Sequence, residues 1–198
     1  MNTVSGVGYL LYGLGKSLFA LLFTLLFNIR VEGRESFPVS GPVVFCANHI
    51  SWWDPPLLAV VAPRTVRFMA KQELFSNRIF GYLLRGVGAF PIKRGAADRR
   101  AIKEALSILE TGQALGMFPE GTRSTSGEMG QGLQGASFLA LKTKAVILPA
   151  AISGEYRFRG EVVVRIGEPF YLDTEGTRSQ QAARGAAAIT EAIGRLKD

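Results

Sequence analysis

The sequence is poor in three residue types that often carry catalytic or structural chemistry. It has one cysteine, one histidine and four aspartates among 198 residues. A single cysteine excludes an internal disulfide framework. One histidine and few aspartates also make a poor ligand set for a catalytic metal. A metal-dependent phosphoesterase using His49, Asp54 and Glu120 is therefore a weak alternative, and chelator sensitivity would test it.

Internal repeats, low-complexity tracts and long linkers are also absent from the sequence. A chain of this length that is 47% hydrophobic can bury one substantial core. We therefore expect two parts: an N-terminal hydrophobic membrane-docking segment over residues 1–30, and one α/β domain over residues 31–198.

The hydrophobic segment is nearly long enough to span a bilayer, because residues 7–27 read VGYLLYGLGKSLFALLFTLLF. Lys16 near its centre is unfavourable in a span, and Gly13 and Gly15 weaken a continuous helix. We therefore favour a pair of short helices lying in one leaflet over a single span. A cleaved signal peptide fits poorly, since no basic residue precedes the apolar run and no A-x-A-like site follows it.

Positive charge exceeds negative charge by seven, with 23 Lys and Arg against 16 Asp and Glu. This balance predicts an anionic partner. Nucleic acid is disfavoured, because the cations are not interleaved with aromatic residues in a recognisable motif. The hydrophobic segment beside a basic domain favours a membrane surface, on the cytoplasmic face of the cell membrane.

The remaining sequence alternates short β-rich runs with helical patterns, which is typical of an α/β fold with a mainly parallel or mixed central sheet flanked by helices. Helices are expected at residues 98–109, 135–142 and 180–197, and another is expected to start at Asp54. The predicted strands are residues 42–47, 66–70, 89–92, 114–118, 145–150 and 161–166.

His49 and Asp54 form the only possible histidine–carboxylate pair in the motif NHISWWD at residues 48–54. A histidine can take a proton from a hydroxyl and return it later, and a carboxylate would fix its tautomer. A spacing of five residues requires a turn between the two side chains. The alternative is structural: Asp54 precedes Pro55 and also fits a helix N-cap.

Two further polar clusters follow apolar runs. In FPEGTRS at residues 118–124, Arg123 can bind a phosphate and Glu120 can accept a hydrogen bond from a hydroxyl. Gly121 lets the backbone approach a ligand closely. In GAFPIKR at residues 88–94, Arg94 is a second candidate cation, and Lys71 after residues 66–70 is a weaker one. For all of these, a solvated sheet edge or a surface ion pair is the structural alternative.

Three other residues leave their roles open. Cys46 could be proposed as a nucleophile near His49, although small thiols in apolar strands usually only pack. Trp52 and Trp53 could anchor at a membrane interface, line an acyl groove or pack in the core.

Four ordered motifs resemble those of the 1-acylglycerol-3-phosphate acyltransferase family: NHISWWD at residues 48–54, GAFPIKR at 88–94, FPEGTRS at 118–124 and VILPA at 146–150. The resemblance implies transfer of a fatty acyl group from a coenzyme A or acyl carrier protein thioester to a glycerol hydroxyl of a lysophospholipid. It implies no cofactor, no metal and no covalent enzyme intermediate. The non-enzymatic alternative is a membrane-attached module that binds anionic lipid without chemistry, and the pair of His49 and Asp54 argues against it.

The resemblance also implies a role for each candidate residue. His49 would be the general base and Asp54 its orienting partner. Arg94 and Arg123 would bind phosphate, and Glu120 with Gly121 would form part of the acceptor site.

One departure from the family pattern concerns the acceptor. Members often carry Phe-Lys-x-Gly after the third motif, where this chain has Gly132-Leu133-Gln134-Gly135. The missing cation makes another lysophospholipid or an amino-acid lipid the alternative acceptor to lysophosphatidic acid, unless Lys142 and Lys144 compensate.

Overall fold

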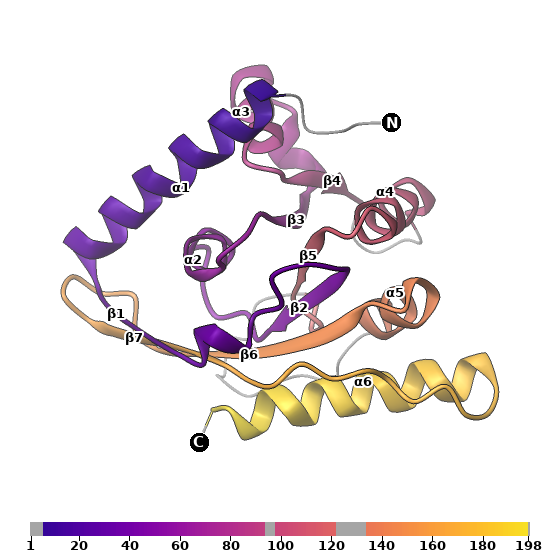
Figure 1. Ribbon diagram of the computed structural model, residues 1–198. Helices are drawn as coiled ribbons and strands as arrows, with labels where there is room; N and C mark the ends of the chain where they lie inside the picture. The colour runs from indigo at the N-terminus through magenta and orange to yellow at the C-terminus, as the bar shows by residue number, and fades with distance from the viewer. Residues whose placement is uncertain (1–5, 94–97, 122–133, 198) are drawn as a thin grey trace.

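A seven-stranded mixed sheet forms the centre of the protein, in the order β1-β7-β6-β2-β5-β3-β4 (Figure 1). The computed structural model describes residues 6–93, 98–121 and 134–197. Strands β6, β2, β5, β3 and β4 run parallel, β7 is antiparallel to β6, and β1 is parallel to β7. The predicted α/β fold with a mixed sheet is confirmed. The strands are β1 Asn28–Glu32, β2 Val43–Ala47, β3 Val66–Lys71, β4 Phe90–Ile92, β5 Ala114–Met117, β6 Val146–Gly154 and β7 Glu161–Ile166.

Helices cover both faces of this sheet. Helices α1 and α2 pack on one face, and α4, α5 and α6 pack on the other (Figure 1). Side chains of the central strand β2 alternate between the two cores, with Phe45 on the α1/α2 side and Cys46 on the opposite side. All five residues of β2 are buried, as expected of a central parallel strand. The helices are α1 Gly6–Leu26, α2 Asp54–Val61, α3 Arg78–Gly86, α4 Arg99–Glu110, α5 Gly135–Thr143 and α6 Arg178–Arg195, with short 3₁₀ turns at Arg34–Ser36 and Gln72–Phe75.

Local capping explains where the predicted helices begin. Asp98 caps α4 by accepting from the backbone N–H groups of Arg100 and Ala101. A bond from the backbone N–H of Lys93, together with these two, lowers the pKa of Asp98. Thr177 and Gln180 form a capping box at the start of α6. The sequence did not predict β1, a mostly exposed edge strand, or α3, a nine-residue helix that contains two glycines.

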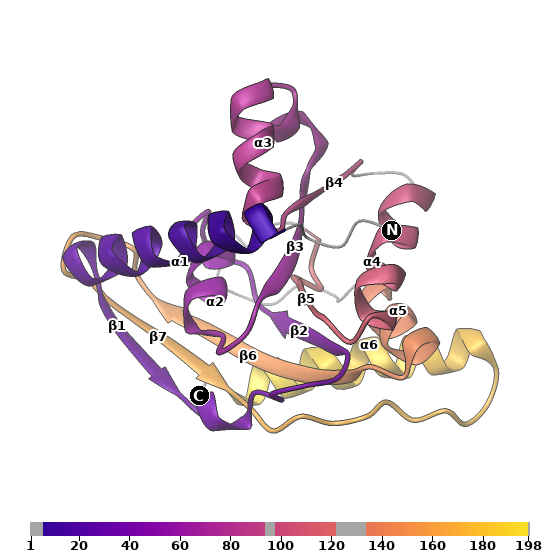
Figure 2. The same ribbon diagram turned by 45° about the horizontal axis from the view of Figure 1, so that its top comes forward.

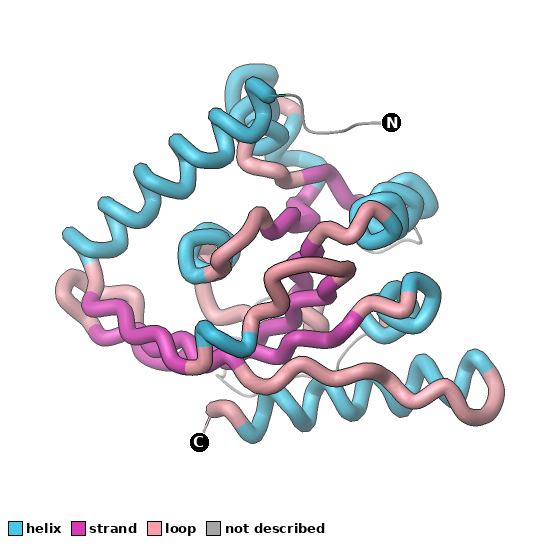
Figure 3. Tube along the Cα trace, viewed as in Figure 1, coloured by secondary structure: helices cyan, strands magenta, loops and turns pink. Residues whose placement is uncertain are grey.

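The prediction of two short N-terminal helices is wrong, because α1 is one continuous helix of 21 residues (Figure 3). Gly15 does not break it: a Cβ there would lie 2.7 Å from Val87 Cγ1, so the glycine lets α1 approach the end of α3. Lys16 donates its ammonium group to the carbonyl of Ala62 at 2.5 Å, at the end of α2. None of the described helices has the length and apolar character needed to cross a bilayer.

The C-terminal part of α1 belongs to the main core. Phe23 and Phe27 are buried in the cluster that includes α2 and the sheet, while α3 rises beside the N-terminal part of α1 (Figure 2). Helix α1 ends at Leu26 and β1 begins at Asn28. The domain boundary expected at residue 30 stays a prediction.

Candidate active site

The polar motifs meet at one edge of the sheet because two neighbouring strands deliver them there. Strands β2 and β5 are parallel and in register, with Cys46 opposite Met117. The loop at residues 48–54 follows β2, and the turn at residues 118–121 follows β5. Sites in α/β proteins are commonly built at such carboxyl ends.

His49 and Asp54 are in direct contact within the loop after β2. His49 Nδ1 lies 2.8 Å from Asp54 Oδ2, the imidazole is mostly buried and the carboxylate is fully buried. The required turn is closed by the same oxygen, which accepts the backbone N–H groups of Ile50 at 2.6 Å and Ser51 at 2.7 Å. With the Nδ1 proton donated to Asp54, neutral His49 carries its lone pair on Nε2.

Asp54 therefore serves the loop as well as the helix. It is the first residue of α2, one position later than the N-cap role considered from the sequence, and Trp53 occupies the cap position. Its carboxylate turns back toward the loop that precedes the helix. A negative charge at a helix N-terminus is also stabilised by the helix dipole.

Two contacts that the sequence did not suggest hold this loop against β6 and the residues that follow it. The side-chain amide of buried Asn48 donates a hydrogen bond to the carbonyl of Ile152 at 2.8 Å. Its Oδ1 accepts a hydrogen bond from the backbone N–H of Ile152 at 2.7 Å. The Tyr156 hydroxyl donates to Asp54 Oδ1 at 2.7 Å. No sequence signal could have found Tyr156, which lies 102 residues from Asp54.

Aromatic rings stack beside the imidazole. The ring of Phe118 lies 4.1 Å from that of His49, and Phe68 lies 6.1 Å beyond Phe118. Gly116 makes room for this arrangement, since a Cβ there would lie 2.1 Å from Phe68 Cε1. Phe68 is on β3, whereas His49 and Phe118 follow β2 and β5, so the tertiary fold fixes the order of the three rings.

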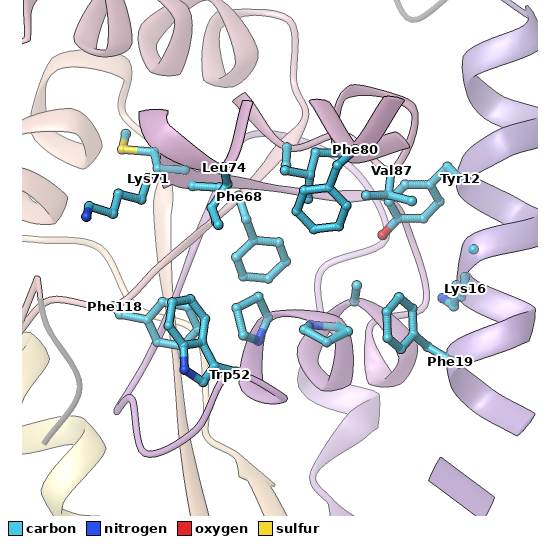
Figure 4. A pocket seen from close by; sticks show the side chains of 18 of the residues that line it. Tyr12, Lys16, Phe19, Trp52, Phe68, Lys71, Leu74, Phe80, Val87 and Phe118 are labelled. Atoms are coloured by element: carbon cyan, nitrogen blue, oxygen red, sulfur yellow. The ribbon is translucent and has the colours of Figure 1, made fainter. Parts of the chain in front are cut away.

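A mainly apolar cavity of about 340 Å³ opens beside His49. Trp52 and Phe118 lie at one end, and Tyr12, Lys16 and Phe19 of α1 lie at the other, with Phe68 and Phe80 between them (Figure 4). The cavity is thus enclosed by α1, α2, α3 and β3.

The other predicted site residues have different surroundings. Lys71 ends β3, lines the cavity and pairs with Glu73 at 3.6 Å, half-exposed. Glu120 follows β5, and its buried Oε1 has no hydrogen-bond partner among the described residues. Gly121 adopts φ 70°, which favours glycine, and donates its N–H to the Phe118 carbonyl. Arg94 and Arg123 lie outside the described residues.

Two further candidates, Cys46 and Trp53, point away from the cavity, whereas Trp52 lines it. Cys46 is fully buried on the opposite face, where burial raises the pKa of its thiol. Trp53 packs against Phe23 and Phe27 in the core, whereas Trp52 is 63% exposed and lines the cavity.

Lys142 and Lys144, which could replace the missing family lysine, lie away from His49. They precede the first residue of β6, Val146, which pairs with the first residue of β2, Val43. His49 follows the other end of β2. Because five strand residues extend roughly 16 Å, the two lysines lie at the far edge of the sheet.

Comparison with known proteins agrees with this architecture. A family model described as Acyltransferase matches residues 28–153, well over half of the chain. The chain therefore belongs to the acyltransferase family, and it is an enzyme of that class. The family identified from the four sequence motifs is confirmed.

Two matches indicate the branch of the family. The chain is 31% identical to the 1-acyl-sn-glycerol-3-phosphate acyltransferase of Bacillus subtilis, over 90% of this chain and 91% of that protein. It also resembles the crystal structure of the 1-acyl-sn-glycerophosphate acyltransferase PlsC from Thermotoga maritima. That match has a TM-score of 0.73 and 28% identity, and covers 96% of this chain and 80% of the other.

A third match has a different name. The lyso-ornithine lipid O-acyltransferase of Pseudomonas aeruginosa is 35% identical over 78% of this chain. The chain spans 57% of that protein.

Proposed function

We propose that this enzyme transfers a fatty acyl group from an acyl-coenzyme A or acyl carrier protein thioester to the free glycerol hydroxyl of a lysophospholipid, with 1-acylglycerol-3-phosphate as acceptor and phosphatidic acid as product. The observation that carries the proposal is a buried His49–Asp54 pair whose imidazole lines an apolar cavity. The names of the Bacillus and Thermotoga proteins support the choice of acceptor.

His49 is the general base in this mechanism. Its Nε2 removes the proton from the acceptor hydroxyl as the oxygen attacks the thioester carbonyl. The tetrahedral intermediate collapses, the carbon–sulfur bond breaks, and the imidazolium returns its proton to the thiolate. Asp54 stabilises the imidazolium between these steps. The thioester is already activated, so a positioned base and proximity are sufficient, and no cofactor is required.

The apolar cavity binds the fatty acyl chain. Each methylene that moves from water into such a site contributes about 0.8 kcal/mol, so ten methylenes contribute roughly 8 kcal/mol. This gain is large compared with any single polar contact to the thioester. Trp52 and Phe118 then flank the acyl group near His49, and α1 closes the far end of the cavity.

Cations bind the phosphate of the acceptor. Arg94 and Arg123 supply bidentate donors, and Lys71, which lines the cavity, is a third candidate. Glu120 and Gly121 complete the acceptor site, with the buried Oε1 of Glu120 accepting a hydrogen bond from an acceptor hydroxyl.

The enzyme acts at a membrane, as a monotopic protein on its cytoplasmic face. Five exposed leucines lie three or four positions apart on α1 and form one face of the helix, which we call the leucine face: Leu10, Leu14, Leu18, Leu21 and Leu25. Helix α3, which packs against α1, adds exposed Ile79, Phe80, Tyr82 and Leu83. Exposed apolar side chains on one face of a helix are typical of interfacial binding.

A lyso-ornithine lipid is the second candidate acceptor. The Pseudomonas relative is named for that substrate, and Gly132-Leu133-Gln134-Gly135 lacks the lysine often found in the family. An acceptor without a phosphate would have less need of that cation.

Thiol release tests the proposal. Purified protein in detergent is incubated with acyl-coenzyme A, with or without 1-acylglycerol-3-phosphate or lyso-ornithine lipid, and the free thiol is measured. We expect acceptor-dependent release that falls at least about 10²-fold in His49→Ala, since a positioned base contributes about 10²–10⁴-fold. Near-wild-type turnover by the variant would contradict the base assignment, and acyl carrier protein donors are tested alongside.

A further inference from the structure

The two carboxylate oxygens of Asp54 have different surroundings. Oδ2 accepts three donors: His49 Nδ1 and the backbone N–H groups of Ile50 and Ser51. Oδ1 accepts the hydroxyl of Tyr156 at 2.7 Å. Because the carboxylate is fully buried, its charge is stabilised by these four hydrogen bonds rather than by water.

Tyr156 belongs to a short segment that holds both ends of the loop at residues 48–54. Ile152 in β6 exchanges two hydrogen bonds with Asn48 at the start of the loop, and Tyr156 binds Asp54 at its end. The Tyr156 ring is itself fixed, since it packs edge-on against Phe27 with 5.4 Å between ring centroids. The hydroxyl is thus aimed at Oδ1 by a well-packed side chain.

We propose that Tyr156 is a positioning residue of the His49–Asp54 pair, which holds Oδ1 of Asp54 and thereby sets the pH at which His49 becomes protonated. The catalytic role of Tyr156 rests on the proposed function, whereas its contact with Asp54 does not.

The hydroxyl remains a donor over the working pH range. Burial and the negative charge of Asp54 raise the pKa of Tyr156 far above that of a free tyrosine. By sharing the charge of Asp54, the hydroxyl weakens the attraction between the carboxylate and a protonated imidazole. Without it, Oδ2 is still held by its backbone donors, and the carboxylate stabilises imidazolium more strongly. The protonation midpoint of His49 therefore rises in Tyr156→Phe.

Other charged groups near His49 are unchanged by this substitution. Lys16 of α1 and Lys71 of β3 line the same cavity, and Glu120 follows Phe118, whose ring stacks on the imidazole. They act equally in the wild type and in the variant. A difference between the two proteins thus reports the loss of the Tyr156 hydroxyl.

The single histidine makes the test direct, because every imidazole resonance of the protein belongs to His49. The midpoint is measured by nuclear magnetic resonance titration of the full chain in detergent micelles, without any substrate. We expect Tyr156→Phe to raise the protonation midpoint of His49 by about 0.5 pH unit or more. A shift of this size corresponds to a fraction of the free energy of a charge-assisted hydrogen bond. Asp54→Asn is the reference variant, and we expect it to lower the midpoint. Tyr171→Phe is the matched control, since Tyr171 is 74% exposed. We expect this variant to leave the midpoint unchanged.

Activity measurements complete the test. We expect the acid limb of the kcat/KM profile of Tyr156→Phe to move in the same direction as the midpoint. At pH 7 we expect kcat to fall about tenfold, with little change in KM for the thioester, as for other groups that orient a reacting residue. A merely structural role would not move the acid limb.

The outcomes separate the two proposals. An unchanged or lowered His49 midpoint in Tyr156→Phe, with a normal response in Asp54→Asn, would overturn the role of Tyr156. A raised midpoint in a protein that transfers no acyl group would support the role of Tyr156 and reject the proposed function.

Discussion

Gly116 shows how one missing side chain determines the geometry beside His49. It pairs with Phe68 across β5 and β3, and a Cβ at Gly116 would lie 2.1 Å from the Phe68 ring. We expect Gly116→Ala to displace Phe68 and the stacked Phe118, at a cost of about 1–3 kcal/mol in the free energy of unfolding. Urea unfolding measures this cost, and kcat/KM should fall with it.

Gly194 provides the control for the same substitution. It lies near the end of α6, and a Cβ there meets nothing within 4 Å. Because alanine has the higher helix propensity, Gly194→Ala should leave stability unchanged or slightly higher. Equal behaviour of the two variants would show that Phe68 adjusts without consequence for the site.

Among the elements, α1 has two faces with different tasks. Phe23 on its inner face and Phe27 directly after its last residue are buried in the core, so deleting residues 1–27 would disturb the fold as well as the proposed membrane contact. Substitutions on the leucine face avoid this problem. Leu14 and Leu18 are 60% and 57% exposed, and each leucine contributes up to about 1.5–3 kcal/mol when buried in lipid.

We expect the double variant Leu14→Glu/Leu18→Glu to lose binding to anionic liposomes in a flotation assay while keeping its thermal stability. Val39→Glu is the control, because Val39 is 88% exposed but lies outside α1 and α3. Retained binding by the double variant would place the membrane contact elsewhere.

The elements also explain what the sequence could predict. Strands β2 to β7 were predicted because apolar runs of β-formers mark them, and α4 was predicted because its apolar residues recur at helical spacing. Strand β1 was missed because its NIRVE sequence is mostly exposed and is stabilised by pairing with β7. Two glycines in a hydrophobic run suggested a broken N-terminal helix, but close packing of α1 on α3 favours the continuous one.

The site was predictable where it is local in sequence. The spacing of His49 and Asp54 required a turn, and the loop after β2 provides it. The contacts of Tyr156 and Phe68 were not predictable, since strand pairing and core packing bring them to the loop.

At the scale of the whole molecule, the cavity is a tertiary product of α1, α2, α3 and β3. Ala59 of α2 lines it, so a larger side chain there should shorten the space available to an acyl chain. For Ala59→Leu we expect kcat/KM for a long acyl-coenzyme A to fall about 30-fold, equivalent to the loss of two or three buried methylenes. An eight-carbon donor should be little affected.

The comparison is made by competing the two thioesters in one reaction and measuring the product ratio. Ala183→Leu is the control for the substitution itself, because Ala183 is an exposed residue of α6. An unchanged ratio in Ala59→Leu would mean that the acyl chain lies outside this cavity.

The leucine face has a consequence for how such an enzyme must be assayed. A catalyst that rests on a bilayer meets its lipid acceptor at a two-dimensional concentration, the mole fraction within the leaflet. Inert phospholipid added at constant bulk acceptor then dilutes the acceptor at the surface and slows turnover, whereas added buffer volume changes little while the enzyme stays bound. The acyl donor still arrives by diffusion in three dimensions, so the two substrates of one reaction obey different concentration scales.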